Sequence, residues 1–381
     1  MAKPSYFIVS CDGGGIRGVI TAMLLENLEA RCPGFLSKVA LFAGTSTGGI
    51  IALGLANGID ISLIRSIYEG KAADIFVRFQ PGTFELLKYV GEYVAELLEP
   101  PAVAAAEIPA QAEAQAEAQA EAQAAALAGI SGTLQTIEGV FHVKYETDGL
   151  VGVLSPLFKG AVMSQLSPVM VATYNIAPEV GESWQPLLLT NLPAPRSTSV
   201  DAFAAGEIPA LDAALATGAA PTFFPPHNVP GIGYCADGGL FANNPSLFAL
   251  NSVISRKNPI GSIAMLSLGT GNIAQRVGTV ADPLAWGVGQ WLLPRQTAEV
   301  PQLLLLQTLM DGQEAIADAQ CAKMLRGRYM RVDPLLSAMF PLDGVQFIPK
   351  MVEETQDYID GKPQRGVPPW QEVVSWVQAN I

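Results

Sequence analysis

Apolar runs alternate with helical patterns along the first 60 residues, and this order predicts parallel strands joined by crossover helices. A β-rich run over 6–11 precedes a segment whose apolar residues recur at helical spacing from Ile20 to Leu28. A second apolar run, 37–43, is followed by an apolar helical segment over 49–56. The alternation favours an α/β fold.

The same pattern continues to residue 98 and resumes after a break at residues 100–149. We expect amphipathic helices over 59–76 and 83–98, strands over 168–174, 185–190 and 263–268, and helices over 212–217, from 245 and over 370–376.

An insertion rich in Ala, Gln and Glu spans about residues 100–130 and interrupts the α/β pattern. Ala-Gln-Ala-Glu repeats run over 110–121, and alanine favours a helix there. Because alanine is its main apolar residue, such a helix cannot anchor a core. A lid or docking arm is one interpretation, and the pattern favours a solvated insertion.

The strongest chemical motif is the G-x-S-x-G at 44–48, which places Ser46 between Gly44 and Gly48. Between a strand and a helix, this motif forms a nucleophile elbow that lifts the serine hydroxyl clear of its backbone. Thr47 follows the serine, and its N–H would face a developing oxyanion. The simpler alternative is a tight turn with an exposed serine.

A serine nucleophile needs a base. The chain has two histidines, His142 and His227, and neither has a catalytic setting; we expect a structural hydrogen bond at a turn for His227. Asp237 precedes Gly238 and Gly239 on a predicted turn and is the better candidate. The chemistry predicted is a Ser-Asp dyad acting on acyl groups.

A glycine-rich loop, Asp12 to Gly18, follows the first strand and opens a helix. Free N–H groups of Gly13, Gly14 and Gly15 suit an anion, including the oxyanion of a tetrahedral acyl intermediate. Arg17 would steady the loop or add positive charge.

The same loop also fits the dinucleotide fingerprint G-x-G-x-x-G. That fingerprint requires an acidic residue about 20 residues further on, at the end of the second strand. The second predicted strand runs into Ala43-Gly44-Thr45-Ser46 without an acid, which weakens the nucleotide interpretation. A glycine-rich turn without a ligand is the third alternative.

Together these motifs resemble those of the patatin-like phospholipases. The matching segments, in the family's order, are 12–18, 44–48, 219–226, 237–239, 243–245 and 266–271. The resemblance implies a three-layer α/β/α fold with a mainly parallel central sheet. It implies a domain over 5–345, followed by a C-terminal helical extension over 346–381.

The resemblance also assigns roles to residues. Ser46 would be the nucleophile and Asp237 the base. The oxyanion hole would comprise Gly13, Gly14, Gly15 and Arg17.

The amino-acid composition limits the kinds of partner that the protein is expected to bind. The formal net charge is −13 and no run of Lys or Arg occurs, which argues against nucleic acid and against broad adhesion to anionic membranes. Lipid contact would therefore be apolar and local, and the segment with Trp286 and Trp291 is either such a patch or ordinary core. The sequence predicts no oligomeric state.

The cellular location and the cofactors are predicted from motifs that the sequence lacks. Four separated cysteines favour free thiols in a reducing compartment, with no cysteine–histidine metal cluster. No signal peptide or membrane span is recognised. We expect a cytoplasmic protein, with export without a cleavable signal as the alternative.

The function expected is hydrolysis of ester bonds in acyl lipids or phospholipids, without metal or organic cofactor. Acyl transfer to an alcohol would use the same dyad. A nucleotide-binding module and a non-catalytic scaffold are alternatives from other classes.

Overall fold

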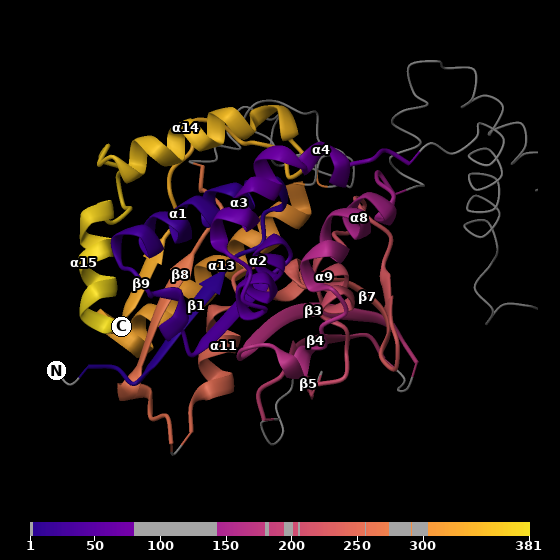
Figure 1. The fold of residues 1–381 in the computed structure, drawn as a ribbon, viewed down its shortest axis with the longest axis horizontal. Coiled ribbons are helices and arrows are strands. Elements are labelled where there is room, and N and C mark those ends of the chain that lie inside the picture. Colours follow the sequence, from indigo (N-terminus) through magenta and orange to yellow (C-terminus); the bar gives the residue numbers. More distant parts are fainter. Residues whose placement is uncertain are drawn as a thin grey trace, which may run out of the picture. The chain divides into compact units, whose positions relative to one another are not determined.

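A mixed nine-stranded sheet forms the centre of the computed structural model (Figure 1). The structure describes residues 3–79, 143–179, 183–193, 201–204, 206–255, 257–273, 291 and 304–381. The strand order is β5-β4-β3-β2-β1-β8-β9, and the β6–β7 hairpin joins through β3. The strands are β1 (Tyr6–Cys11), β2 (Leu41–Thr45), β3 (Val169–Pro178), β4 (Gln185–Thr190), β5 (Asp201–Ala204), β6 (His227–Val229), β7 (Gly233–Asp237), β8 (Ile263–Leu268) and β9 (Tyr329–Val332).

Parallel pairing dominates the centre of the sheet. β1 pairs in parallel with β2 and β8, β2 with β3, and β8 with β9. All residues of β2 and β8 are buried, as continuous apolar runs in a sheet covered on both faces should be. The antiparallel pairs are β3–β4, β3–β7 and β6–β7.

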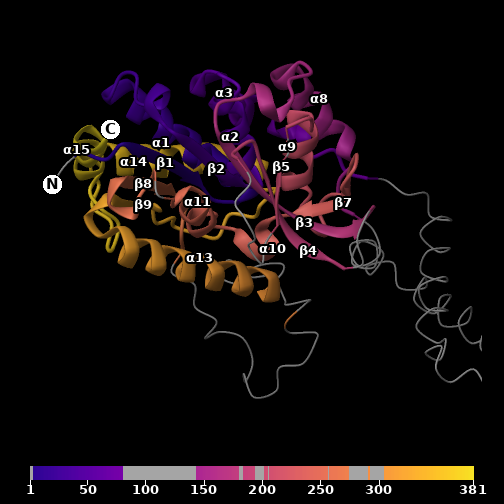
Figure 2. The ribbon, with the colours of Figure 1, turned by 90° about the horizontal axis from the view of Figure 1, so that it is seen from below.

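Helices cover both faces of the sheet, so the expected three-layer α/β/α fold is confirmed (Figure 2). One layer contains α1 (Gly18–Arg31), α2 (Thr47–Ala56), α3 (Ile61–Gly70), α4 (Ala72–Ile75), α8 (Thr147–Phe158), α9 (Ala210–Gly218) and α14 (Ile348–Ile359). The other contains α10 (Gly239–Ala242), α11 (Ser246–Val253) and α13 (Leu304–Leu325). The core on this second side includes Ile8, Met170, Leu250 and Cys321.

The C-terminal residues pack onto these elements. α14 contacts α1, and α15 (Trp370–Asn380) contacts β9. The Trp370 side chain is buried, and its indole N–H donates to Asn27 Oδ1 at 2.7 Å.

Some predicted strands and helices are longer in the structure, with β3 ending at Pro178 and α15 at Asn380, and two others differ in their start or continuity. The second strand begins at Leu41 rather than residue 37, because Leu36–Lys38 forms a 3₁₀ turn. The Glu29 carboxylate fixes that turn by accepting the N–H groups of Gly34 and Leu36. The helix predicted over 59–76 is split into α3 and α4 at Lys71, which directly follows Gly70.

A second compact unit comprises residues 77–146 and 221–225. In its described part, the Lys144 and Tyr145 N–H groups donate to the carbonyls of Thr222 and Phe223. The predicted helix over 83–98, the Ala/Gln/Glu-rich insertion, His142 and Trp286 lie outside the described residues.

Candidate active site

Strand register brings Ser46 and Asp237 together. β2 and β7 share one edge of β3: Thr45 pairs with Ala172, and the next residue along β3, Thr173, pairs with Asp237. Because β2 runs parallel to β3 and β7 runs antiparallel to it, the carboxyl ends of β2 and β7 meet head-on. The residue that follows β2 is Ser46.

Ser46 has the backbone geometry of a nucleophile elbow. Its φ of 54° and ψ of −125° are outside the favoured regions for a residue with a side chain, a conformation that costs roughly 1–3 kcal/mol. The flanking glycines permit it: an added Cβ would lie 2.1 Å from Gly48 O at Gly44, and 2.2 Å from Cys11 O at Gly48. Strand, elbow and helix follow one another as the motif requires.

Thr217 orders the elbow from the neighbouring helix α9. Its hydroxyl accepts the Ser46 N–H at 2.9 Å and donates to the Ala172 carbonyl at 2.6 Å. The Thr217 side chain is fully buried. Sequence reasoning missed this residue because it lies 171 positions from Ser46 and belongs to none of the recognised motifs.

Asp237 is buried beside the serine. Burial raises the pKa of its carboxyl to about 7, although hydrogen bonds from the Ser46 side chain and the Gly239 N–H oppose the shift. The Gly239 N–H donates to Asp237 Oδ1 at 2.7 Å. The carboxylate is thus oriented by one fixed donor and faces the serine hydroxyl.

The glycine-rich loop lies against the elbow. A Cβ added to Gly13 would be 3.3 Å from Ser46 Cβ. The Gly13 peptide is held on both sides: its N–H donates to Asn243 O at 3.0 Å, and Thr270 Oγ1 donates to Gly13 O at 3.0 Å. In the described part of the chain, the Gly14 and Gly15 N–H groups have no protein acceptor.

Packing around the loop does not favour the dinucleotide interpretation. A Cβ on Gly14 would be 2.1 Å from Thr270 Oγ1, and one on Gly15, whose φ is +58°, would be 2.3 Å from Leu342 O. The Ile16 N–H donates to that same Leu342 carbonyl at 2.8 Å. The glycines therefore allow close packing of protein rather than the approach of a pyrophosphate.

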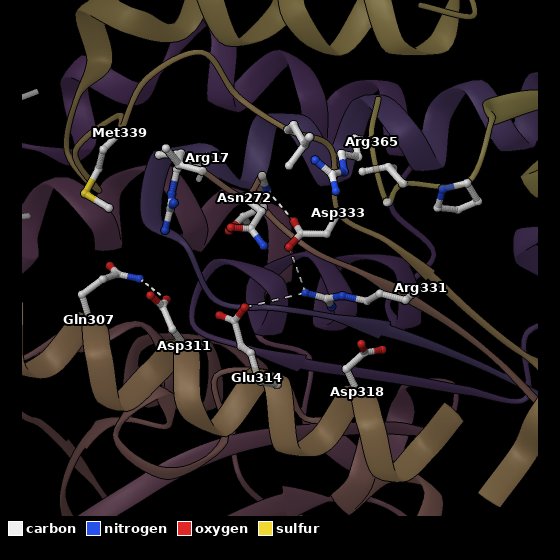
Figure 3. Close-up of a pocket in the computed structure, with 18 residues that line it drawn as sticks. Arg17, Asn272, Gln307, Asp311, Glu314, Asp318, Arg331, Asp333, Met339 and Arg365 are labelled. Atoms are coloured by element: carbon white, nitrogen blue, oxygen red, sulfur yellow. Dashed lines mark hydrogen bonds and ion pairs between the residues drawn. The ribbon is translucent and has the colours of Figure 1, made fainter. Parts of the chain in front are cut away.

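Arg17 is buried at one wall of a polar cavity of about 510 Å³ behind the loop (Figure 3). Its Nε donates to Gly14 O at 3.4 Å. Burial lowers the pKa of the guanidinium, against the attraction of Glu314, Asp333 and Asp311. Arg17 thus steadies the backbone of the glycine loop.

A largely buried ion-pair network, with Asp12 as its most buried member, supports the start of the same loop. Arg331 Nη1 on β9 lies 2.6 Å from Asp12 Oδ2, and Arg331 Nη2 lies 3.3 Å from Asp333 and 3.7 Å from Glu314. Burial raises the pKa of Asp12, and repulsion by Glu314 and Asp333 adds to this against the pull of Arg331. No sequence signal marks Arg331, whereas Asn243 and Thr270 lie in segments that matched the family.

Two further predicted residues have packing roles. Thr47 Oγ1 makes a short hydrogen bond with the Tyr68 hydroxyl, and burial raises the pKa of Tyr68. His227 opens β6 instead of lying in a turn, because its backbone pairs with Cys235, and its Nε2 lies 2.9 Å from Asp212 Oδ1. The structural hydrogen bond expected for His227 is therefore present.

No group of three or more His, Cys, Asp or Glu side chains suited to a metal ion occurs among the described residues. The four cysteines are free and buried. Of the helices that the structure describes, none is long and apolar enough to cross a membrane.

The fold and the elbow define an α/β protein in which a partly buried serine and a buried aspartate meet where β2 and β7 end on β3. The family model described as patatin-like phospholipase matches residues 9–250. The chain therefore belongs to the patatin-like phospholipase family, whose members are lipid hydrolases.

The curated relatives are similar at moderate identity. A cGAMP-activated phospholipase of Pseudomonas aeruginosa is 27% identical over 87% of this chain and 78% of that protein. A protein of the same name from Escherichia coli is 29% identical over 66% of this chain, which spans 56% of that relative. The crystal structure of VipD from Legionella pneumophila aligns over 94% of this chain and 67% of that one, at 12% identity and a TM-score of 0.38.

Proposed function

We propose that this protein hydrolyses carboxylic ester bonds of acyl lipids through Ser46 and Asp237. The observation that carries the proposal is the strand register that places Ser46, whose φ is 54°, directly after β2 and opposite the buried Asp237 at the end of β7. A strained serine beside a desolvated carboxylate is the arrangement that activates a weak nucleophile.

The reaction would proceed in two steps. Asp237 takes the proton of the Ser46 hydroxyl as the oxygen attacks the ester carbonyl, and the alcohol leaves with that proton. Water then attacks the acyl-enzyme with Asp237 again as base, which releases the fatty acid and restores the serine.

The oxyanion would be bound by backbone amides. The Gly14 and Gly15 N–H groups are the best placed, since the Gly13 N–H is engaged by Asn243 O. The Thr47 N–H, directly after the nucleophile, adds a third donor at the first turn of α2. Arg17 would support the oxyanion hole indirectly, because its Nε donates to the Gly14 carbonyl.

The cellular location and the alternative activities belong to the same proposal. Four free, buried cysteines are consistent with a reducing compartment, and we place the protein in the cytoplasm. Among the described residues, no structural feature favours acyl transfer or nucleotide binding as a second function.

The test is lipid profiling by mass spectrometry after incubation of mixed phospholipids with the wild type and with Ser46→Ala. We expect free fatty acid and lysophospholipid with the wild type and neither with the variant. Equal product from both proteins would refute the proposal.

A further inference from the structure

The acidic side chains of helix α13 point toward the protein interior rather than toward solvent. Its three acidic residues, Asp311, Glu314 and Asp318, all line the polar cavity and are half-buried. Figure 3 shows them projecting from α13 into that cavity, on the side of Arg17 and Arg331. A surface helix normally has the opposite arrangement, with its charges toward solvent.

The outward face of α13 is mostly apolar, and its exposed polar residues are Thr308, Gln320 and Lys323. Leu305, Leu309 and Ile316 are 38%, 53% and 57% exposed. They lie at positions i, i+4 and i+11, which share one face of a helix, and exposed Gly312 completes the stripe at i+7. We call Leu305, Leu309, Gly312 and Ile316 the α13 stripe.

The absence of exposed acidic residues on this face contrasts with the acidic composition of the chain. The chain carries 35 acidic and 22 basic residues. Yet no Asp or Glu occurs among the exposed residues of α13, which is described over 304–325, and Lys323 is its one exposed charge. Single exposed apolar residues are ordinary, as Leu63 and Ile254 are here, whereas a contiguous apolar stripe marks an interaction site.

The helix that carries the stripe also contacts the candidate active site. Its Gln313 Nε2 donates to Leu240 O at 3.0 Å, and Glu314 Oε1 accepts a hydrogen bond from the Asn243 side chain. A Cβ added to Gly239, two residues after Asp237, would be 3.6 Å from Met310 Cε. The stripe therefore lies on the outside of the element that packs against the Asp237 turn.

We propose that the α13 stripe docks the protein on the surface of a lipid aggregate, by inserting Leu305, Leu309 and Ile316 among lipid head groups. This inference rests on the proposed function, which gives the protein a substrate that resides in such aggregates. A face without acidic groups suits uncharged lipid, which a chain of net charge −13 can approach without repulsion. Three half-exposed side chains offer much less than the roughly 800 Å² per partner that a stable protein dimer buries.

The test pairs the variant Leu309→Gln/Ile316→Gln with the control Leu63→Gln/Ile254→Gln, which changes exposed apolar residues on α3 and after α11. Binding is measured by flotation with phosphatidylcholine vesicles, with all proteins also carrying Ser46→Ala so that the lipid stays intact. We expect the bound fraction to fall about tenfold or more in the stripe variant and to stay unchanged in the control. Added salt should have little effect on binding, since the contact is apolar.

A second measurement separates docking from catalysis. With Ser46 restored, the stripe variant should hydrolyse a dissolved short-chain ester at the wild-type rate and vesicle phospholipid at least about tenfold more slowly. Flotation of the stripe variant at the wild-type level would overturn the inference. A wild type that is dimeric by light scattering, beside a monomeric stripe variant, would overturn it in favour of a second copy. If the wild type hydrolysed neither substrate but still floated with vesicles, and the stripe variant did not float, the proposed function would be refuted. The docking surface would then be supported on its own.

Discussion

Thr217 holds the backbone of Ser46: its hydroxyl accepts a hydrogen bond from the serine N–H at 2.9 Å and donates one to Ala172 O at 2.6 Å. The strained φ of the serine is thereby tied to the central strand β3. The elbow is held by a side chain from α9 as well as by its own glycines.

Replacing Thr217 with valine should therefore disturb the elbow more than the core. The Ser46 N–H would be left without its acceptor, at a cost of about 1–3 kcal/mol in the free energy of unfolding. Displacement of the nucleophile should lower kcat roughly tenfold or more. The control is Thr355→Val, because buried Thr355 donates only to the Met351 carbonyl one turn away. Equal kcat in both variants would contradict the anchoring role.

Ser46 should be the single serine that reacts with a fluorophosphonate. Among the described residues, Ser46 is the one serine with positive φ, and strand register places it beside the buried Asp237 carboxyl group. Peptide mass spectrometry should find one labelled peptide, and Ser46→Ala should abolish both labelling and ester hydrolysis. Labelling of another peptide at a similar rate would show that the nucleophile lies elsewhere.

Activity should fall below neutral pH even though no histidine takes part. Asp237 must be ionised to accept a proton, and its pKa is about 7. The logarithm of kcat/KM should therefore rise with pH and level off above about 7. His227→Gln should have the same profile as the wild type, since His227 bonds to Asp212. An acid limb near 4 would mean that Asp237 is not desolvated in solution.

Asp237→Asn should be inactive and more stable than the wild type at alkaline pH. The folded-state pKa of about 7 exceeds the unfolded value of about 3.9, so ionisation of Asp237 opposes folding increasingly from pH 4 to 7. Removal of this charge should add about 2–4 kcal/mol to the free energy of unfolding at pH 8, and less at pH 5. Turnover should fall at least roughly a hundredfold. Urea denaturation at the two pH values measures the first effect, and a loss of stability at pH 8 would contradict it.

Arg331→Met should destabilise the protein by about 3–5 kcal/mol, because Asp12, Glu314 and Asp333 would lose their shared cation. Adding Asp12→Asn should recover part of that loss, since it removes the most buried of the three carboxyl groups. Chemical denaturation of the single and double variants forms the test. Additive losses would show that Asp12 and Arg331 are not coupled.

The sequence predicted the strands that are buried apolar runs. The bounds of β1, β4 and β8 are confirmed because polar or turn residues delimit each run. The predicted start of β2 was wrong, since Glu29, from the preceding helix, fixes a turn where the apolar pattern continues. Local periodicity contains no information on such a contact.

The candidate site also contains residues that the sequence predicted and residues that it could not predict. Ser46, Asp237 and the glycine loop were found by motif, and the structure brings them together; their catalytic roles stay predictions. The junction of β2 and β7 on β3 could not be predicted, because it depends on strand register between distant segments. Thr217 and Arg331 had no motif to mark them, and they became visible only through their contacts.

The Asp12–Arg331 ion pair also orders events during protein synthesis. The ribosome completes Ser46 and Asp237 by residue 237, but the cation that pairs with Asp12 at the start of the glycine-rich loop is not made until 94 residues later, at residue 331. A growing chain thus carries an unfinished candidate site until Arg331 has been added. Lipolytic activity should accordingly appear only when the last third of the chain has joined the sheet.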